Sequence, residues 1–394
     1  MKLLILALGT MFLQQTFAAL GRNLPAIIAP AIIADLALDP AWIGIYVAMA
    51  SAGALVAQLG CGSFIIRDGA LRMSQISLVM VGIALVVATP GPLLFFAVSA
   101  ILLGAGAAMS TPASSHLLGR YSPIRYAPLV FSLKQTAVPA GLLVAGLLGP
   151  LLTNDWGWRG AMLAIGASCI VFAVMLEPTR REFDSDRNPS RRFHLSDLPR
   201  TLTVVLRNPG LRNLAIACFA FVGMQIVFVS FFVTYLVTLD VSLATAGVIF
   251  SVATLIAVPG RVFWGWFSSV RASPSVVLGA LGVGTAASTL LVALGGSLGS
   301  LWVMGLAAFA LSSTVLSWHG VLLAEAARLA PEGMRGAATG GVLSFGQMGS
   351  LVLPLIYSVA LTTTGSHAIG FVLCGLPGLV VGVMMMLGGR RRTS

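Results

Sequence analysis

Twelve long apolar stretches run through this chain of 394 residues, and they constrain its fold more than any other feature. Each holds about 20 mostly apolar residues, the length that a helix needs to cross a lipid bilayer. Strands of a transmembrane barrel are shorter and alternate strictly between apolar and polar residues. The stretches therefore predict an all-α integral membrane protein with twelve transmembrane helices, near residues 4–33, 41–65, 73–89, 92–118, 126–152, 159–176, 211–238, 242–269, 274–295, 299–326, 335–362 and 366–388.

Charge is scarce and unevenly distributed. Only 9% of the residues are charged, against about 25% in a soluble domain. With the N-terminus inside, 19 of the 23 Lys and Arg fall in cytoplasmic junctions, three lie inside apolar stretches, and only Arg159 lies on the outer side. This positive-inside pattern predicts a multi-pass protein of a bacterial inner membrane with both termini in the cytoplasm. It also explains the net charge of +11 without nucleic acid.

One alternative concerns the first stretch, which could be a cleaved secretory signal with Phe17-Ala18-Ala19 as a weak cleavage site. Its removal would leave eleven spans and break the charge pattern, so we expect it to be the first span. The four cysteines lie in or at spans without metal-ligand spacing, and they are expected to fill apolar space.

The longest polar segment divides the chain into two halves. We expect an N-terminal six-helix bundle over 1–176, a cytoplasmic linker over 177–210 and a C-terminal six-helix bundle over 211–394. Within the linker, Ser196 could cap a short basic amphipathic helix that ends near Arg207 and lies on the inner leaflet. The halves echo each other, because Ser132-Leu133-Lys134-Gln135 and Ser344-Phe345-Gly346-Gln347 occupy equivalent spans. Two parallel six-span halves related by a pseudo-two-fold axis are a known transporter plan.

After the second span the sequence reads Gly62-Ser63-Phe64-Ile65-Ile66-Arg67-Asp68-Gly69-Ala70-Leu71-Arg72. This junction resembles the signature loop of the major facilitator superfamily, which joins helices 2 and 3. That signature is a Gly, three residues, an acid, a basic residue, any residue, a Gly and then basic residues. Ile66 replaces the acid, and in the poorer second copy Ser269 replaces it. The residues that fit, and that we expect to form the gating motif, are Gly62, Arg67, Gly69 and Arg72 in the first half, with Gly265 and Arg271 in the second.

The resemblance covers the whole chain, and it implies alternating access around a cavity lined by helices 1, 2, 4, 5, 7, 8, 10 and 11. A narrower likeness rests on two arginines. Arg22 lies in a stretch similar to helix 1 of the cyanate and nitroimidazole transporters. Arg261 stands one turn before the motif Gly, where monocarboxylate and oxalate transporters hold the substrate carboxylate.

Three basic side chains lie inside the apolar stretches: Arg22, Lys134 and Arg261. A charge at mid-bilayer costs roughly 2.5–3.5 kcal/mol on insertion scales, so such groups face a protein interior or a watery cavity. The alternatives are that Arg22 pairs with Asp35 or Asp39, that Lys134 reaches the cytoplasmic surface, and that Arg261 binds a carbonyl or Glu325. A guanidinium group can hold a carboxylate through two parallel hydrogen bonds.

Other polar and aromatic residues in the spans complete the expected binding site. They avoid the interiors of spans 3, 6, 9 and 12, which agrees with the family's lipid-facing helices. Tryptophans and a lone histidine in a helix can equally be packing residues, although histidine could titrate near neutral pH. The predicted set is Gln14, Gln58, Gln135, Gln225, Gln347, Trp264, Trp318 and His319.

No acid lies at mid-membrane, and Glu325 comes closest. Proton-driven carriers and exporters of cationic drugs usually rely on a buried carboxylate. Anion exchange, proton symport or passive facilitation therefore remain open. No nucleotide-binding, metal-binding or nucleophile motif is present, so we expect no enzyme activity, no catalytic residues, no metal and no cofactor.

These patterns predict a monomeric secondary transporter of a small anion, most simply an organic carboxylate, embedded in the lipid bilayer. An exporter of apolar or weakly acidic compounds is the alternative, because Met, Phe and Trp are frequent. A membrane sensor without transport would need a signalling domain, for which the linker offers little room.

Overall fold

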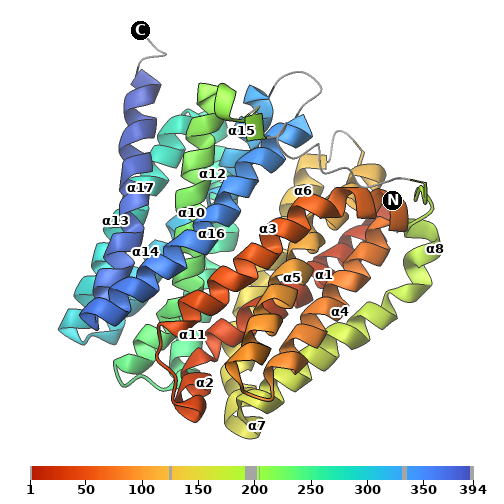
Figure 1. Cartoon of the computed structure of the whole chain (residues 1–394). Helices are drawn as coiled ribbons and strands as arrows, with labels where there is room; N and C mark the ends of the chain where they lie inside the picture. The colour runs from red at the N-terminus through yellow and green to blue at the C-terminus, as the bar shows by residue number, and fades with distance from the viewer. Residues whose placement is uncertain (1, 124–126, 191–201, 204, 331–334, 391–394) are drawn as a thin grey trace. The chain divides into compact units, whose positions relative to one another are not determined.

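The computed structural model describes residues 2–123, 127–190, 202–203, 205–330 and 335–390, and within these ranges the elements are helices with no strand. The helices form two compact units (Figure 1). Unit 1 comprises Met1–Leu38 and Met49–Leu195, and unit 2 comprises Asp39–Ala48 and Ser196–Ser394. The bundle boundaries expected at residues 176 and 211 stay a prediction, and the expected linker helix from Ser196 lies largely outside the described residues.

Unit 1 contains the first six spans and the start of the linker. Its helices are α1 (Lys2–Ile27), α2 (Ala29–Leu36), most of α3 (Trp42–Asp68), α4 (Ala70–Ala88), α5 (Leu93–Tyr121), α6 (Ala127–Gln135) and α7 (Ala137–Met175), followed by the short 3₁₀ turn η1 (Glu177–Thr179) and α8 (Arg180–Phe183).

Small residues bring the helices of unit 1 close together. Helix α4 packs against α5 and α7, and α1 packs against α7. A Cβ atom added to Gly82 of α4 would lie 2.7 Å from the carbonyl oxygen of Gly166 in α7, and one on Gly141 would lie 2.6 Å from that of Thr16 in α1. Without a hydrophobic force between helices in lipid, such close approach is a main source of helix association.

Unit 2 contains the remaining spans. Its helices are α10 (Pro209–Thr238), α11 (Leu243–Leu255), α12 (Ala257–Val270), α13 (Pro274–Leu298), α14 (Leu301–Val315), α15 (His319–Leu329), α16 (Arg335–Thr364) and α17 (His367–Arg390).

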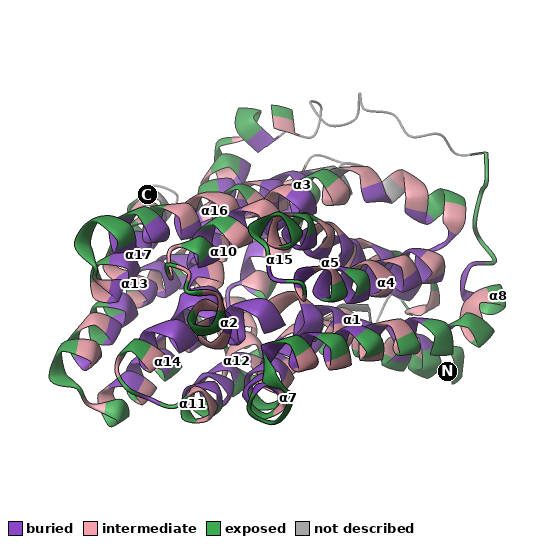
Figure 2. Ribbon diagram, turned by 60° about the horizontal axis from the view of Figure 1, so that its bottom comes forward, coloured by how far each residue is buried: buried purple, intermediate pink, exposed green. Residues whose placement is uncertain are grey.

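The same packing rule holds in unit 2, where α13 lies against α17 and α10 against α16. A Cβ on Gly282 would come within 2.5 Å of the Gly378 carbonyl oxygen, and one on Gly349 would overlap the Phe219 carbonyl. Buried and exposed residues share most helices (Figure 2), as expected for helices that each turn one side to a neighbour. One core cluster of unit 2 gathers Phe221, Leu278, Trp318 and Leu322.

The twelve predicted spans are confirmed. Ten described helical segments are long and apolar enough to cross a membrane. One of them, Leu133–Phe183, has 51 residues and contains the fifth and sixth spans, while α3 adds the second span with a shorter apolar section. Gly157 separates the fifth and sixth spans, because its backbone (φ 70°, ψ 169°) is not helical.

Four spans are interrupted within the membrane-crossing part. Spans 1, 5 and 8 break at Ile28, Thr136 and Ile256, each two or three residues before a proline. Proline lacks a backbone N–H and its ring opposes the carbonyl four residues earlier. The tenth span breaks over Leu316–Trp318, where there is no proline. Pro25, Pro150 and Pro354, by contrast, lie inside continuous helices.

Candidate functional site

Lys134 is the most deeply buried charged side chain of unit 1. It lies on α6, two residues before the break at Thr136, and is 1% exposed. Its Nζ atom forms no hydrogen bond to any residue that the structure describes. The side chain therefore does not reach the surface, as the alternative reading required. Gln135 beside it is half-buried.

Arg22 lies on α1 and is partly buried. Among the described residues it forms no ion pair, and the two acids considered as its partners are engaged elsewhere. Asp35 accepts hydrogen bonds from Arg159 Nη1 at 2.6 Å and Trp158 Nε1 at 3.0 Å. Asp39 accepts from the backbone N–H of Ala41 at 2.7 Å. The alternative pairing of Arg22 with Asp35 is therefore not what the structure shows, and the pairing with Asp39, a residue of unit 2, stays a prediction.

Gln14 is fully buried in a polar cross-link between α1, α4 and α5. Its Nε2 donates to Ser110 Oγ at 3.0 Å and to the Ser74 carbonyl at 3.3 Å, and Ser77 Oγ lies 2.7 Å from Ser110 Oγ. These bonds hold three helices together in the interior. Gln58 is half-buried on α3 and lies outside this cross-link.

Arg261 of unit 2 binds the break in the tenth span. Its Nε donates to the carbonyl oxygen of Leu316 at 2.8 Å, so the carbonyl alternative is observed for this residue. Glu325 instead pairs with Arg328, whose Nη2 lies 2.6 Å from Glu325 Oε1. A Cβ on Gly260 would lie 2.6 Å from Ser317 Oγ, so α12 approaches the break closely. Arg261 thus donates a hydrogen bond to a backbone carbonyl group at the helix interruption.

His319 and Trp318 lie at the same break. Trp318 is fully buried, donates from Nε1 to the Val315 carbonyl at 2.8 Å, and stacks on Phe221 with ring centroids 5.8 Å apart. His319 stacks on Trp318 at 3.8 Å, and its buried Nδ1 has no partner among the described residues. Trp318 is therefore a core residue in this structure, whereas His319 keeps an unused polar atom beside Arg261.

The other predicted residues of unit 2 are half-buried: Trp264, Gln225 and Gln347. Trp264 contacts Phe263 and Phe267 on its own helix. Gln225 Oε1 is buried without a partner in the described part of the chain, and Gln347 Oε1 accepts from Ser350 Oγ at 3.3 Å. Within unit 2, the sequence-predicted residues that come together are Arg261, Trp318 and His319.

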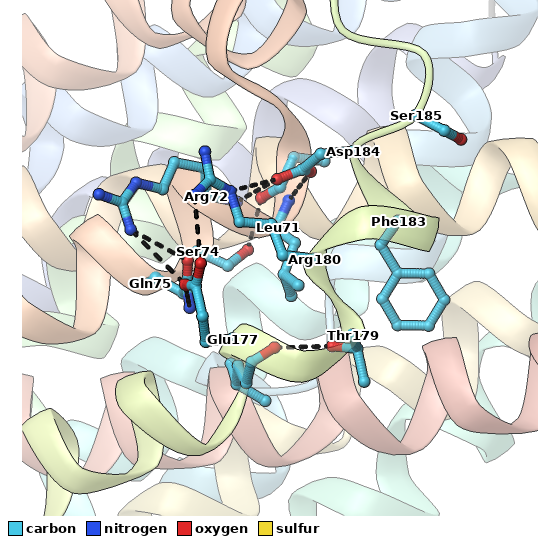
Figure 3. Close-up of polar contacts among 12 residues, drawn as sticks. Leu71, Arg72, Ser74, Gln75, Glu177, Thr179, Arg180, Phe183, Asp184 and Ser185 are labelled. Carbon is cyan, nitrogen blue, oxygen red and sulfur yellow. Dashed lines mark hydrogen bonds and ion pairs between the residues drawn. The ribbon is translucent and has the colours of Figure 1, made fainter.

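The first copy of the gating motif ends at Arg72 in the first turn of α4, where Asp184 of the linker lies beside it (Figure 3). Gly69 has φ 104° and provides no side chain to cap the helix. Asp184, from the linker, accepts hydrogen bonds from the N–H groups of Leu71 at 2.7 Å and Arg72 at 3.0 Å. Burial raises the pKa of the Asp184 carboxyl, while these two N–H groups lower it. Arg67 pairs with its neighbour Asp68 at 2.9 Å.

The second copy is organised locally. The chain between α12 and α13 contains Arg271, whose N–H closes the last turn of α12 on the Phe267 carbonyl at 2.9 Å. Ser273 then caps α13 by accepting from the Val276 N–H at 3.4 Å, and Pro274 follows. Gly265 lies inside α12, where a Cβ would meet no heavy atom within 4 Å.

Sequence reasoning did not single out Asp184, and it did not pair Asp35 with Arg159. Each acts through a partner more than 100 residues away, and no local motif marks such a pair. The absence of an acid at Ile66 was a signal that another carboxylate could serve this loop. Among the described residues, no group of three His, Cys, Asp or Glu side chains could hold a metal ion.

The fold defines a multi-pass membrane protein. The family model of the Major Facilitator Superfamily matches residues 11–326. The chain therefore belongs to this superfamily, whose members are transporters, and its twelve-helix fold is confirmed. The likeness to cyanate, nitroimidazole, monocarboxylate and oxalate carriers stays a prediction.

Solved structures agree on the fold. A POT family transporter in complex with a thioalcohol-conjugated peptide is 14% identical, covers 98% of this chain and 96% of its own, and has a TM-score of 0.80. A bacterial homolog of the human lysosomal transporter Spinster, inward-facing and occupied, is 16% identical, covers 97% and 96%, and has a TM-score of 0.74. At such identities the likeness concerns the fold alone. No curated protein matches this chain.

Proposed function

We propose that this chain is a secondary transporter that moves a small organic anion, most simply a carboxylate, across the inner membrane of a bacterium by alternating access. We further propose that it works as a monomer with both termini in the cytoplasm, as the distribution of Lys and Arg indicates. Membrane transport follows from membership of the Major Facilitator Superfamily. The anionic substrate is supported by the buried basic residues.

One observation carries the proposal: Lys134 is buried inside unit 1 without a partner for its charge. It is 1% exposed, and its Nζ has no hydrogen-bond partner among the described residues. None of the eight ion pairs between described residues includes it. Removing an ammonium group from water costs several kcal/mol unless an opposite charge compensates. An anionic substrate would supply that charge.

Unit 2 supports the same chemistry with a different geometry. Arg261 and His319 lie at the interruption of the tenth span, and broken helices in transporters expose backbone groups to ligands. His319 Nδ1 is a buried polar atom without a partner in the described residues. We propose Arg261 and His319 as ligands for an anion that this unit contacts.

Counterflow of labelled carboxylates in proteoliposomes tests the proposal. We expect Lys134→Ala to raise the half-saturating concentration by at least about thirtyfold, because truncating one side of a buried charge contact costs about 2–5 kcal/mol. Lys134→Arg should retain part of the affinity. Arg181→Ala removes an exposed positive charge of the linker and is the matched control. Unchanged uptake by the double variant Lys134→Ala/Arg261→Ala would refute the basic site.

Substrate identity can be approached without a transport assay. A ligand that binds the folded protein stabilises it by about 2.7 kcal/mol at one hundred times its dissociation constant. We expect carboxylates to raise the thermal unfolding midpoint of the wild type in detergent, and to have no such effect on Lys134→Ala. Stabilisation by neutral apolar compounds alone, equal in both proteins, would favour the exporter alternative instead.

A further inference from the structure

The start of the linker is fastened to one end of unit 1 over residues 177–188, here called the clasp. It includes η1 and α8, and Figure 3 shows the carboxylates of Asp184 and Glu177 beside Leu71, Arg72 and Gln75 of α4. Phe183 is fully buried and packs on Tyr121 of α5 with ring centroids 5.6 Å apart. An apolar anchor of this kind orients the polar contacts on either side of it.

Asp184 occupies the place of a helix cap in α4. With Gly69 as N-cap residue, Leu71 and Arg72 are the second and third residues of the helix, and these are the N–H groups that an N-cap side chain normally binds. Glycine has no such side chain, and Asp184 binds both groups from a distance of more than 110 residues in sequence. A Cβ on Gly69 would overlap this carboxyl group. The glycine therefore admits the linker's acid.

Two further carboxylates hold the clasp against the bundle. Asp186 pairs with Arg120 Nη1 at 3.1 Å and His116 Nε2 at 2.9 Å, both on α5. Glu177 Oε2 accepts from Gln75 Nε2 at 2.8 Å and lies 3.8 Å from Arg72 Nη1. The clasp thus contacts both α4 and α5.

The last contact of the clasp reaches the residue that departs from the family motif. The backbone N–H of Asn188 donates to the carbonyl oxygen of Ile66 at 2.7 Å. Ile66 itself is 37% exposed and offers no charge. The linker therefore runs along loop 66–72, in which Ile66 stands at the acid position of the motif, and it brings Asp184 to the start of α4.

We propose that Asp184 is a positioning residue of the transport cycle: it takes the role of the motif acid that is missing at position 66, and it holds loop 66–72 and the linker together as one gate element. The linker is then held against unit 1 as far as Asn188, beyond the end of α7. This inference rests on the proposed alternating access, and it does not depend on which substrate is carried.

Hydrogen exchange of single amides tests the contact. In Asp184→Ala we expect the amides of Leu71 and Arg72 to exchange at least tenfold faster than in the wild type. Asp184→Asn should be intermediate, because its one amide oxygen can still cap the helix. Asp186→Asn removes a neighbouring carboxylate of the clasp and should leave both amides protected. Unchanged exchange in Asp184→Ala would overturn the inference.

Spin-label distances test the role in the cycle without any substrate. The four native cysteines are buried, so new cysteines at the exposed positions Gly119 and Arg212 can be labelled selectively. We expect Asp184→Ala to change the populations in the distance distribution between these labels. Asp184→Asn should restore the wild-type distribution in part, and Asp186→Asn should leave it unchanged.

The outcomes separate this inference from the proposed function. A changed amide exchange with an unchanged distance distribution would reduce Asp184 to a structural cap and overturn the gate role. A wild-type protein that shows the expected distance changes but fails in carboxylate counterflow would remove the anion proposal and leave the clasp intact. If the wild type shows a single distance between the two labels and no variant shifts it, both the gate role of Asp184 and alternating access are contradicted.

Discussion

The third and ninth spans begin in equivalent places of the two halves, yet their first turns are capped in different ways. Helix α13 starts at Pro274 and is capped by Ser273 directly before it. Helix α4 starts after Gly69, which has no capping side chain, and Asp184 of the linker supplies the cap instead. The cap of α13 comes from the residue directly before the helix, whereas the cap of α4 comes from the linker at the other end of unit 1 in sequence.

This difference shows how one loop can become coupled to a linker. The first four N–H groups of any helix lack partners within the helix. A serine before the helix meets that need locally. A glycine leaves it open, and a distant carboxylate can then bind and bring its own segment along. The predictions below test whether the two junctions differ as the contacts indicate.

The largest effect is expected for Gly69→Ala. The backbone of Gly69 (φ 104°, ψ 151°) lies in a region that only glycine adopts readily, at a cost of about 1–3 kcal/mol for other residues. The added Cβ would also displace Asp184. The thermal unfolding midpoint in detergent should fall further than in any other variant described below. Gly265→Ala, a motif glycine within a helix and with open space around it, should leave the midpoint unchanged or raise it.

Asp184→Ala should destabilise unit 1 by about 2 kcal/mol, the upper range for loss of a helix cap, because the group is buried. Thermal unfolding and trypsin cleavage at Arg180, Arg181 and Arg187 measure the effect. Cleavage at these sites should accelerate in Asp184→Ala. If cleavage and midpoint both match those of the wild type, the start of α4 does not depend on the linker.

Ser273→Ala should have a smaller effect, about 0.5 kcal/mol, because its hydrogen bond to Val276 is long at 3.4 Å. The change should be confined to the start of α13. Hydrogen exchange should speed up at Val276 and leave Leu71 and Arg72 unaffected. Faster exchange at the start of α4 in this variant would mean that the two junctions are not independent.

The smallest effect extends the comparison to the opposite end of unit 1, where Asp35 joins Trp158 and Arg159. The hydrogen bond from Trp158 and the nearby Arg159 lower the pKa of Asp35. An acid with a lowered pKa stabilises the folded state above its ordinary pKa of about 4, and this contribution disappears as the pH falls through the lowered value.

The difference in unfolding midpoint between wild type and Asp35→Asn should therefore shrink as the pH is lowered from neutral to below about 4. Asp155→Asn, which changes an exposed acid close in sequence to Trp158, is the control and should show no such trend. A midpoint difference that stays constant over this range would contradict the assignment of Asp35 to this contact.

Much of the architecture follows from local sequence. Twelve apolar stretches of spanning length give twelve spans, since backbone groups in lipid must bond within their own helix. Pro30, Pro139 and Pro259 mark interruptions because proline removes a donor and crowds the preceding turn. Pro25, Pro150 and Pro354 also lack an N–H group, but they lie inside continuous helices. Proline in the sequence therefore indicates where a helix can break and does not predict which of these positions breaks.

The candidate site was predicted by residue type more than by contact. Lys134 was expected to be buried, and it is, since an apolar helix carries it inward. Gln14 and Trp318 were expected to lie near the substrate. In the structure Gln14 forms hydrogen bonds that join three helices, and Trp318 lies in the core of unit 2. Helix packing decides these cases, because a polar or aromatic side chain within a span has several neighbours that its own sequence does not specify.

The sequence by itself determined the spans, their orientation signal, the basic residues within them and the missing acid at Ile66, because each of these depends on residues close together in the chain. Only the tertiary structure decided that Asp184 caps α4, that Arg159 forms an ion pair with Asp35 and that Arg261 binds the Leu316 carbonyl. Those contacts join residues 55 to 124 positions apart, and their partners are chosen by how the helices pack.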